Sequence, residues 1–205
     1  MKPRSLSTRH IGVPVFFLCA FGLLTPAAMA EEAKFAVNPV VEAKVKELPP
    51  GPLFWRLDNF PTLKQAQGAA GPTSLAAEVE GKVWLFTLGP KGGASTGGTH
   101  VVDIGPLPPI NASEYLLRVN RAGGAPGAKT KVHSHPGPEA FYVLTGKVGQ
   151  RTPHGVTYVE AGGTMIGHGA DTPMEVFNAG TTNLDELAIF VVDANRPFST
   201  PASLD

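Results

Sequence analysis

Short apolar runs follow one another through the second half of the chain, separated by turns rich in Gly and Pro. The runs are rich in Val, Ile, Phe and Tyr, as β-strands are, and no segment between them has the apolar repeat of an amphipathic helix. The pattern predicts strands over residues 115–120, 129–133, 139–144, 147–152, 156–160, 174–178 and 184–192. Short strands at this spacing predict an all-β sandwich or barrel.

The first half of the chain is less regular. Residues 54–60 carry Phe, Trp and Leu around Arg56 and Asp58, so we expect this segment to pack on the outside of the barrel. Residues 74–88 predict a β-hairpin that would extend one sheet of the barrel. The expected division is an N-terminal extension at 31–73, with a short helix at 40–48 and a small-residue linker at 65–72, then a barrel at 74–195 and a loose tail at 196–205.

The first 30 residues have the pattern of a secretory signal peptide. Lys2, Arg4 and Arg9 give a basic start, residues 11–24 are largely apolar, and Ala28-Met29-Ala30 matches a small-x-small cleavage site. The apolar run is too short for a good membrane anchor. We therefore expect cleavage at this site and a periplasmic or secreted mature protein that has no contact with a membrane.

Cleavage would change the charge and the cysteine count. The full chain has 17 basic and 17 acidic residues, and losing the three basic residues of the signal leaves 14 against 17, a net charge near −3. The basic residues do not cluster, which argues against nucleic acid or an anionic membrane as a partner. Cys19, the only cysteine, also leaves with the signal, so the mature protein would have no disulfide.

Candidate chemistry is concentrated in residues 127–146, which read GAKTKVHSHPGPEAFYVLTG. His133 and His135 are two residues apart, and on a strand such side chains point to the same face of the sheet. A Pro-Gly-Pro turn follows, and Glu139 begins a second apolar run that can return its carboxylate beside the imidazoles. Two histidines and one carboxylate in this arrangement bind a divalent transition metal and leave coordination positions open.

This stretch resembles the first motif of the cupin superfamily: Gly, five residues, His-x-His, three or four residues, Glu, six residues, Gly. Gly127, His133, His135, Glu139 and Gly146 fill those places. The resemblance covers about 114–192 and implies a jelly-roll barrel, also called a double-stranded β-helix. It also implies a divalent transition metal (Fe, Mn, Cu, Ni or Zn) bound by the two histidines and the glutamate.

The second cupin motif, which normally adds a further metal-binding histidine, is divergent here. Counting from Gly155 puts Ile166 in the histidine place, whereas the better-fitting end of the motif at 172–178 puts Met174 there. Residues 167–171 form an apparent insertion that contains His168. Three interpretations remain open: Met174 is a weak fourth ligand or leaves the place to water, His168 swings in as the ligand, or His168 is exposed and the barrel holds a three-ligand metal or none.

The resemblance implies a metal pocket and no particular reaction. We expect an exported metal-dependent enzyme, a dioxygenase-like oxidoreductase that acts on a small organic molecule. The alternative is a non-catalytic cupin that binds a small molecule or a metal. A homodimer is a further expectation, because Phe54 and Trp55 precede the barrel and need burial.

Overall fold

The computed structural model describes Met1 and residues 33–204. The predicted signal peptide falls outside the described residues except for Met1. The chain divides into two units, Met1–Glu31 and Glu32–Asp205, and the second unit holds all the described helices and strands. Among the described residues no helix has the length and hydrophobicity that a membrane crossing requires.

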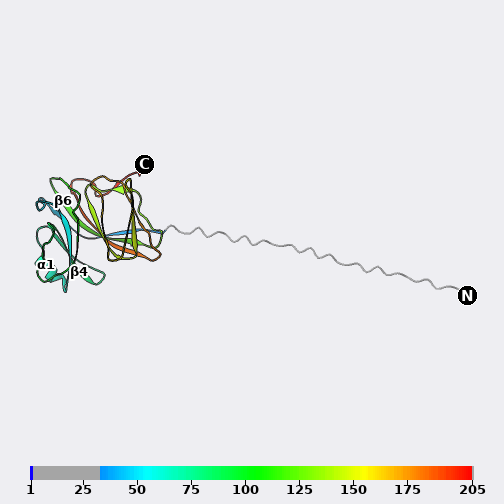
Figure 1. The fold of residues 1–205 in the computed structure, drawn as a ribbon, viewed down its shortest axis with the longest axis horizontal. Helices are drawn as coiled ribbons and strands as arrows, with labels where there is room; N and C mark the ends of the chain where they lie inside the picture. Colours follow the sequence, from blue (N-terminus) through cyan, green and yellow to red (C-terminus); the bar gives the residue numbers. More distant parts are fainter. Residues whose placement is uncertain (2–32, 205) are drawn as a thin grey trace. The chain divides into compact units, whose positions relative to one another are not determined.

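The regular elements of the second unit are β-strands with one short helix, as the all-β prediction requires. Its elements are β1 (Ala36–Val45), β2 (Phe54–Phe60), α1 (Leu63–Ala69), β3 (Ser74–Val79), β4 (Lys82–Gly89), β5 (Thr99–Ile104), β6 (Tyr115–Gly124), β7 (His133–Ser134), β8 (Glu139–Thr145), β9 (Lys147–Thr152), β10 (Gly155–Glu160), β11 (Thr164–Ile166), β12 (Glu175–Asn178), β13 (Leu184–Asp193) and β14 (Thr200–Pro201). Figure 1 shows α1 and β4 at one end of this unit and the yellow and orange strands at the other.

Two sheets form the barrel. One has the order β1-β6-β13-β8-β11, and the other contains β10-β9-β12. An isolated bridge joins His133 of β7 to Met174, the residue before β12, and β14 pairs with β7. From β6 to β13 the chain passes from one sheet to the other at each step except the β9–β10 hairpin, which is the jelly-roll topology. The expected double-stranded β-helix is therefore confirmed.

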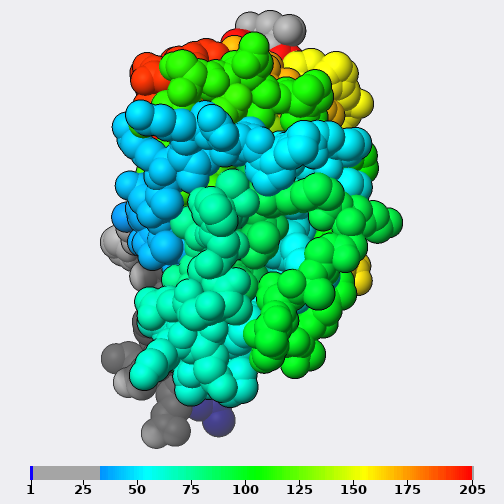
Figure 2. All heavy atoms as spheres, turned by 90° about the vertical axis from the view of Figure 1, so that its left-hand side faces the viewer, coloured from blue at the N-terminus to red at the C-terminus, as the bar shows by residue number. Residues whose placement is uncertain are grey.

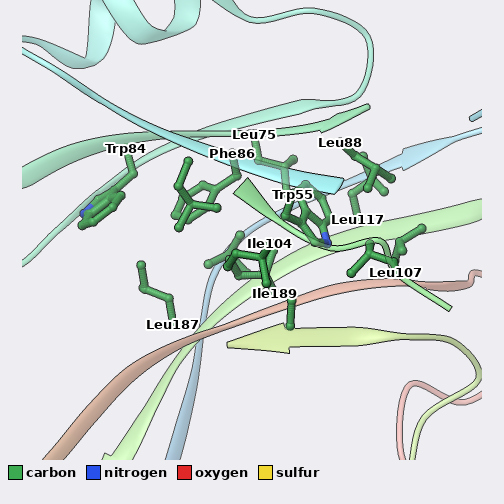
Figure 3. Close-up of a cluster of buried hydrophobic side chains, with 14 of the residues drawn as sticks. Trp55, Leu75, Trp84, Phe86, Leu88, Ile104, Leu107, Leu117, Leu187 and Ile189 are labelled. Carbon is green, nitrogen blue, oxygen red and sulfur yellow. The ribbon is translucent and has the colours of Figure 1, made fainter. Parts of the chain in front are cut away.

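A separate sheet of order β3-β4-β2-β5 covers the outer face of the five-stranded barrel sheet. Figure 3 shows Trp55, Trp84 and Phe86 of this outer sheet beside Leu187 and Ile189 of β13. The Trp84 ring also lies 5.6 Å from the ring of Tyr142 on β8, measured between centroids. The expectation that residues 54–60 pack on the outside of the barrel is confirmed. Figure 2 views the molecule from the side that the N-terminal half, coloured blue to green, forms.

Several expectations for the N-terminal half are wrong. The helix expected at 40–48 is strand β1, which pairs with β6 because its valines pack against the core. The hairpin of β3 and β4 is present, but it pairs with β2 instead of extending a barrel sheet. The expected linker at 65–72 overlaps most of helix α1, whose first turn is capped by the Thr62 hydroxyl. Strand pairing thus runs across the boundary expected at residue 73.

Inside the barrel, β13 alternates between two environments. Leu187, Ile189 and Val191 face the outer sheet, whereas Ala188 and Phe190 belong to the cluster between the two barrel sheets. This alternation is the two-residue period of a strand that is buried on both faces. It sets which side chains of β13 can reach the barrel interior.

Candidate metal centre

The residues of the first motif meet inside the barrel, at the end of β7 and the start of β8. The imidazole rings of His133 and His135 have centroids 4.9 Å apart and lie edge to face. Nε2 of His135 is 3.8 Å from Oε2 of Glu139. The same-face geometry expected from the His-x-His spacing therefore brings the three side chains together. Whether they bind a metal stays a prediction, because within residues 33–204 no three His, Cys, Asp or Glu side chains form a ready-made metal cage.

Hydrogen bonds to backbone carbonyls orient both imidazoles. Nδ1 of His133 is 2.8 Å from the Lys131 carbonyl, and Nδ1 of His135 is 2.6 Å from the Phe198 carbonyl. A carbonyl only accepts, so each Nδ1 carries the hydrogen and donates it. In this tautomer a neutral imidazole keeps its lone pair on Nε2. Metal-binding histidines usually have this arrangement, so the donor chemistry fits a divalent metal.

Burial sets the charge state of the two innermost groups. It raises the pKa of Glu139 to about 8, even though Gln150 donates a hydrogen bond of 2.6 Å to Oε1. It also lowers the pKa of His135 to about 4, with help from the charges of His133 and Arg118, although the bond to the Phe198 carbonyl opposes the shift. Without a metal, this pair is therefore neutral near pH 7 and is not an ion pair.

Met174 lies next to the candidate ligands, where the divergent second motif puts it. It is 1% exposed, and its backbone exchanges two hydrogen bonds with His133, of 2.9 and 2.8 Å. The Gln150 amide that holds Glu139 also donates to the Met174 sulfur at 3.4 Å. Gln150 thus connects the carboxylate to the thioether, whose role as a ligand is untested.

His168 is placed differently. Its Nε2 lies 3.3 Å from the Thr152 hydroxyl, and its ring packs against His154 with centroids 4.9 Å apart. The preceding residue, Gly167, donates its N–H to the Glu139 carbonyl, and a Cβ there would lie only 2.4 Å from Glu139 Cγ. Only glycine fits this close approach, so the insertion packs on the backbone of Glu139 while His168 itself lies beside the β9–β10 turn.

A cavity of about 400 Å³ opens from the candidate ligands into the barrel. Its wall is mostly apolar. Four of the residues that line it lie outside the sequence motifs and are not predicted by them: Arg118, Asn120, Glu186 and Phe198. The alternation of a strand is the signal that could identify Glu186. Side chains two residues apart on a strand face the same side, and Glu186 is four residues before Phe190, which faces the barrel interior from β13.

The C-terminal tail is not loose, in contrast to the expectation. β14 pairs with β7, and the Phe198 ring packs on His135 with centroids 4.7 Å apart. The guanidinium carbon of Arg118 lies 4.4 Å from the centre of the same ring. The tail is ordered because its backbone pairs with a strand and its aromatic side chain, which is partly buried, packs against two rings and a cation. It forms one wall of the cavity beside the candidate ligands.

No family model matches the chain, and no curated protein matches it. Solved structures do. A structure of the DMSP lyases RdDddP and RnDddQII has 21% identity and a TM-score of 0.37, covering 42% of this chain and 44% of that chain. A cupin-like protein from Thermotoga maritima has 19% identity and a TM-score of 0.38, covering 43% and 65%. An oxalate oxidase with bound glycolate has 22% identity and a TM-score of 0.36, covering 41% and 45%. The matched part thus spans less than half of the lyase and oxidase chains, and the likeness is one of fold.

Proposed function

We propose a function that starts from membership of the cupin superfamily, which the jelly-roll strand order and the complete first motif support. The protein is an exported, metal-dependent enzyme, a dioxygenase-like oxidoreductase that acts on a small organic molecule. The observation that carries this proposal is the pair of carbonyl-oriented imidazoles, which lie beside a buried carboxylate in the wall of a largely apolar cavity.

The residues of the cavity have separable tasks in this proposal. His133, His135 and Glu139 hold the metal, which is iron, manganese, copper, nickel or zinc and which supplies open coordination positions for substrate and dioxygen. The Lys131 and Phe198 carbonyls keep the imidazoles in place, and the Gln150 amide orients the carboxylate. Phe141, Val176 and Phe190 provide the apolar wall that excludes water.

Metal content tests the proposal directly. We expect about one redox-active metal per chain, by mass spectrometry, in protein that has been exported naturally and purified without chelators. His135→Ala should lose it, and His154→Ala is the matched control because that exposed histidine lies outside the cavity. Dioxygen uptake with phenols, thiols and dicarboxylates then tests the reaction class. Background metal in a wild-type protein with normal circular dichroism would refute the metal-dependent enzyme.

Export has its own test. Cleavage at the small-x-small site predicts that the mature protein begins at Glu31, which N-terminal sequencing of periplasmic or secreted material would detect. An intact Met1 in the exported fraction would contradict the assignment. The homodimer stays a prediction, but Trp55 no longer calls for it because this side chain is 0% exposed in the protein's own core.

The second candidate is a non-catalytic cupin that binds a small molecule or a metal. The observation that favours it is Met174 in the place where the second motif normally has a histidine, because a thioether is a weaker ligand than an imidazole. Saturable binding by equilibrium dialysis, with no turnover of any ligand that binds to metal-loaded protein, would support this candidate over the enzyme.

A further inference from the structure

Two side chains of β6 present hydrogen-bond donors to the cavity without acceptors. Arg118 and Asn120 are two residues apart on this strand, and both line the cavity of the candidate metal ligands. Nε of Arg118 donates to Oδ1 of Asn120 at 2.8 Å. A guanidinium only donates, so this bond fixes which end of the Asn120 amide is the oxygen and turns its nitrogen, Nδ2, away from Arg118. Nδ2 and both terminal nitrogens of Arg118 make no hydrogen bond to any residue of 33–204.

These three nitrogens are accessible. Asn120 is 1% exposed and the Arg118 side chain 19%, yet none of the three nitrogens is a buried atom without a partner within the described part of the chain. Each one therefore keeps accessible surface, and Asn120 faces the barrel interior, so its exposed nitrogen faces the cavity. Donors that are open to a cavity and lack an acceptor in the protein can bind a ligand.

The other contacts of Arg118 hold it in place and leave its terminal N–H groups available. Oε2 of Glu42 is 3.3 Å from Nη1, but this contact is not a hydrogen bond, and the Glu42 side chain is 54% exposed. Solvent screens an ion pair that is exposed to this degree. The guanidinium carbon lies over the Phe198 ring, 4.4 Å from its centre. That contact uses the face of the guanidinium, whereas its N–H groups point outward in its plane.

The register of the sheet places these donors level with the candidate metal ligands. Phe190 of β13 lies opposite Arg118 of β6 on one side and opposite Glu139 of β8 on the other. Neighbouring strands are about 4.8 Å apart, so the backbones at Arg118 and Glu139 are separated by roughly 10 Å. Both side chains line the cavity from this row. One small molecule can therefore contact Arg118 at one end and the candidate ligands at the other.

The donors suit a carboxylate. Its two oxygens only accept, and its charge complements that of the guanidinium, which binds carboxylates with two parallel hydrogen bonds. A cationic group would be repelled by Arg118 and by Lys131, which also lines the cavity. The argument holds for either state of Glu139, which adds no net negative charge whether it is neutral or bound to a metal cation. Burial also raises the pKa of Glu186, which favours its neutral form.

We propose that Arg118 and Asn120 bind the carboxylate of a small organic acid, whose other end lies beside His133, His135 and Glu139. This inference rests on the proposed function in taking the cavity as the small-molecule site, and it specifies the substrate class as carboxylic acids.

The test is isothermal titration calorimetry of the full mature protein as purified, with n-butyrate as the probe and butyramide as its neutral counterpart. Butyrate should bind the wild type at least tenfold more tightly than butyramide. Arg118→Gln should weaken butyrate at least tenfold and change butyramide by less than threefold, with the metal content of the wild type. Arg121→Gln is the matched control, because that arginine of the same strand binds Asp185 by two hydrogen bonds of 2.8 and 2.9 Å and is not part of the cavity wall.

Asn120→Asp is a second variant. It keeps the oxygen that accepts from Arg118 and replaces the donor nitrogen with an acceptor, so it should also weaken butyrate at least tenfold. Equal affinity of the wild type for the two probes would overturn the proposal, and this comparison needs no variant. Loss of butyrate binding in Lys131→Gln but not in a folded Arg118→Gln would overturn it as well, because the anion would then bind at the lysine.

Chelator-treated protein separates this proposal from the proposed function. Butyrate binding that disappears on chelation and is unchanged by Arg118→Gln would assign the carboxylate to the metal and overturn the inference. Butyrate binding that depends on Arg118 in a protein without metal would support the inference, even though the metal-dependent enzyme would then be refuted.

Discussion

At the scale of the residue, burial controls the behaviour of the candidate site. Glu139 has an ordinary pKa near 4.5 when unfolded and about 8 when folded, so the folded protein holds the extra proton between these values. A group with a raised carboxyl pKa stabilises the fold at low pH, and that stability is lost as the pH rises through the folded value. The pKa of His135 is lowered to about 4, so its contribution to the free energy of unfolding rises with pH instead. That change is confined mainly to the range below pH 6.5.

The pH range from 6.5 to 8 therefore isolates the buried carboxylates. In chelator-treated protein we expect the free energy of unfolding to fall across this range, with a slope of up to about 1.4 kcal/mol per pH unit for each such group. Glu139→Gln should remove the part of this slope that Glu139 contributes, and the variant should be more stable than wild type at pH 8. Urea denaturation at half-unit steps measures this, with the exposed Glu47→Gln as control. Identical slopes in wild type and Glu139→Gln would contradict the prediction. Glu186, whose pKa is also raised by burial, accounts for the remaining slope.

At the scale of the element, the tail containing β14 completes the environment of His135. Removing residues 196–205 would delete the Phe198 carbonyl that fixes the tautomer of this imidazole, together with the ring that covers it. Loss of such a supporting group typically costs 10- to 100-fold in metal affinity. We expect a loss of this size in a competition titration with Co²⁺.

Phe198→Ala separates the two contributions of the tail, because it keeps the carbonyl and removes the ring. Its affinity for Co²⁺ should lie between that of the wild type and that of the truncated chain. Tyr158→Ala, an exposed aromatic on β10, is the control. Undiminished affinity in the truncated chain, with its far-ultraviolet circular dichroism preserved, would show that the tail does not orient the site.

The sequence predicts some site residues and the strands that carry them better than others. The His-x-His pair and Glu139 are within seven residues of one another, so local spacing and one turn suffice to place them. Glu186 and Phe198 are distant in sequence, and their positions depend on the registers of β13 with β8 and of β14 with β7. The sequence does not predict β1, because an edge strand with mostly exposed residues lacks the clear alternation of a buried one. Tertiary pairing decides these cases, and local pattern does not encode it.

At the scale of the whole molecule, one hydrophobic core joins the outer sheet to the barrel. Trp84 of β4 is 1% exposed and packs between Phe86 of its own strand and Tyr142 of β8. Because the two layers share this core, neither can unfold without exposing a large apolar face of the other. We therefore expect the outer sheet and the barrel to unfold as one cooperative unit.

Trp84→Ala tests this cooperativity. Truncating a buried tryptophan typically costs about 3–5 kcal/mol, and Leu187→Ala, which removes the facing side chain from β13, about 2–5 kcal/mol. Each variant should shift a single transition, seen at the same midpoint by tryptophan fluorescence and by circular dichroism. Val156→Ala on exposed β10 is the control and should leave the midpoint within about 0.5 kcal/mol. Two transitions, with Trp84→Ala moving only the fluorescence midpoint, would mean that the outer sheet is an independent domain. The barrel would then hold its cavity without that support.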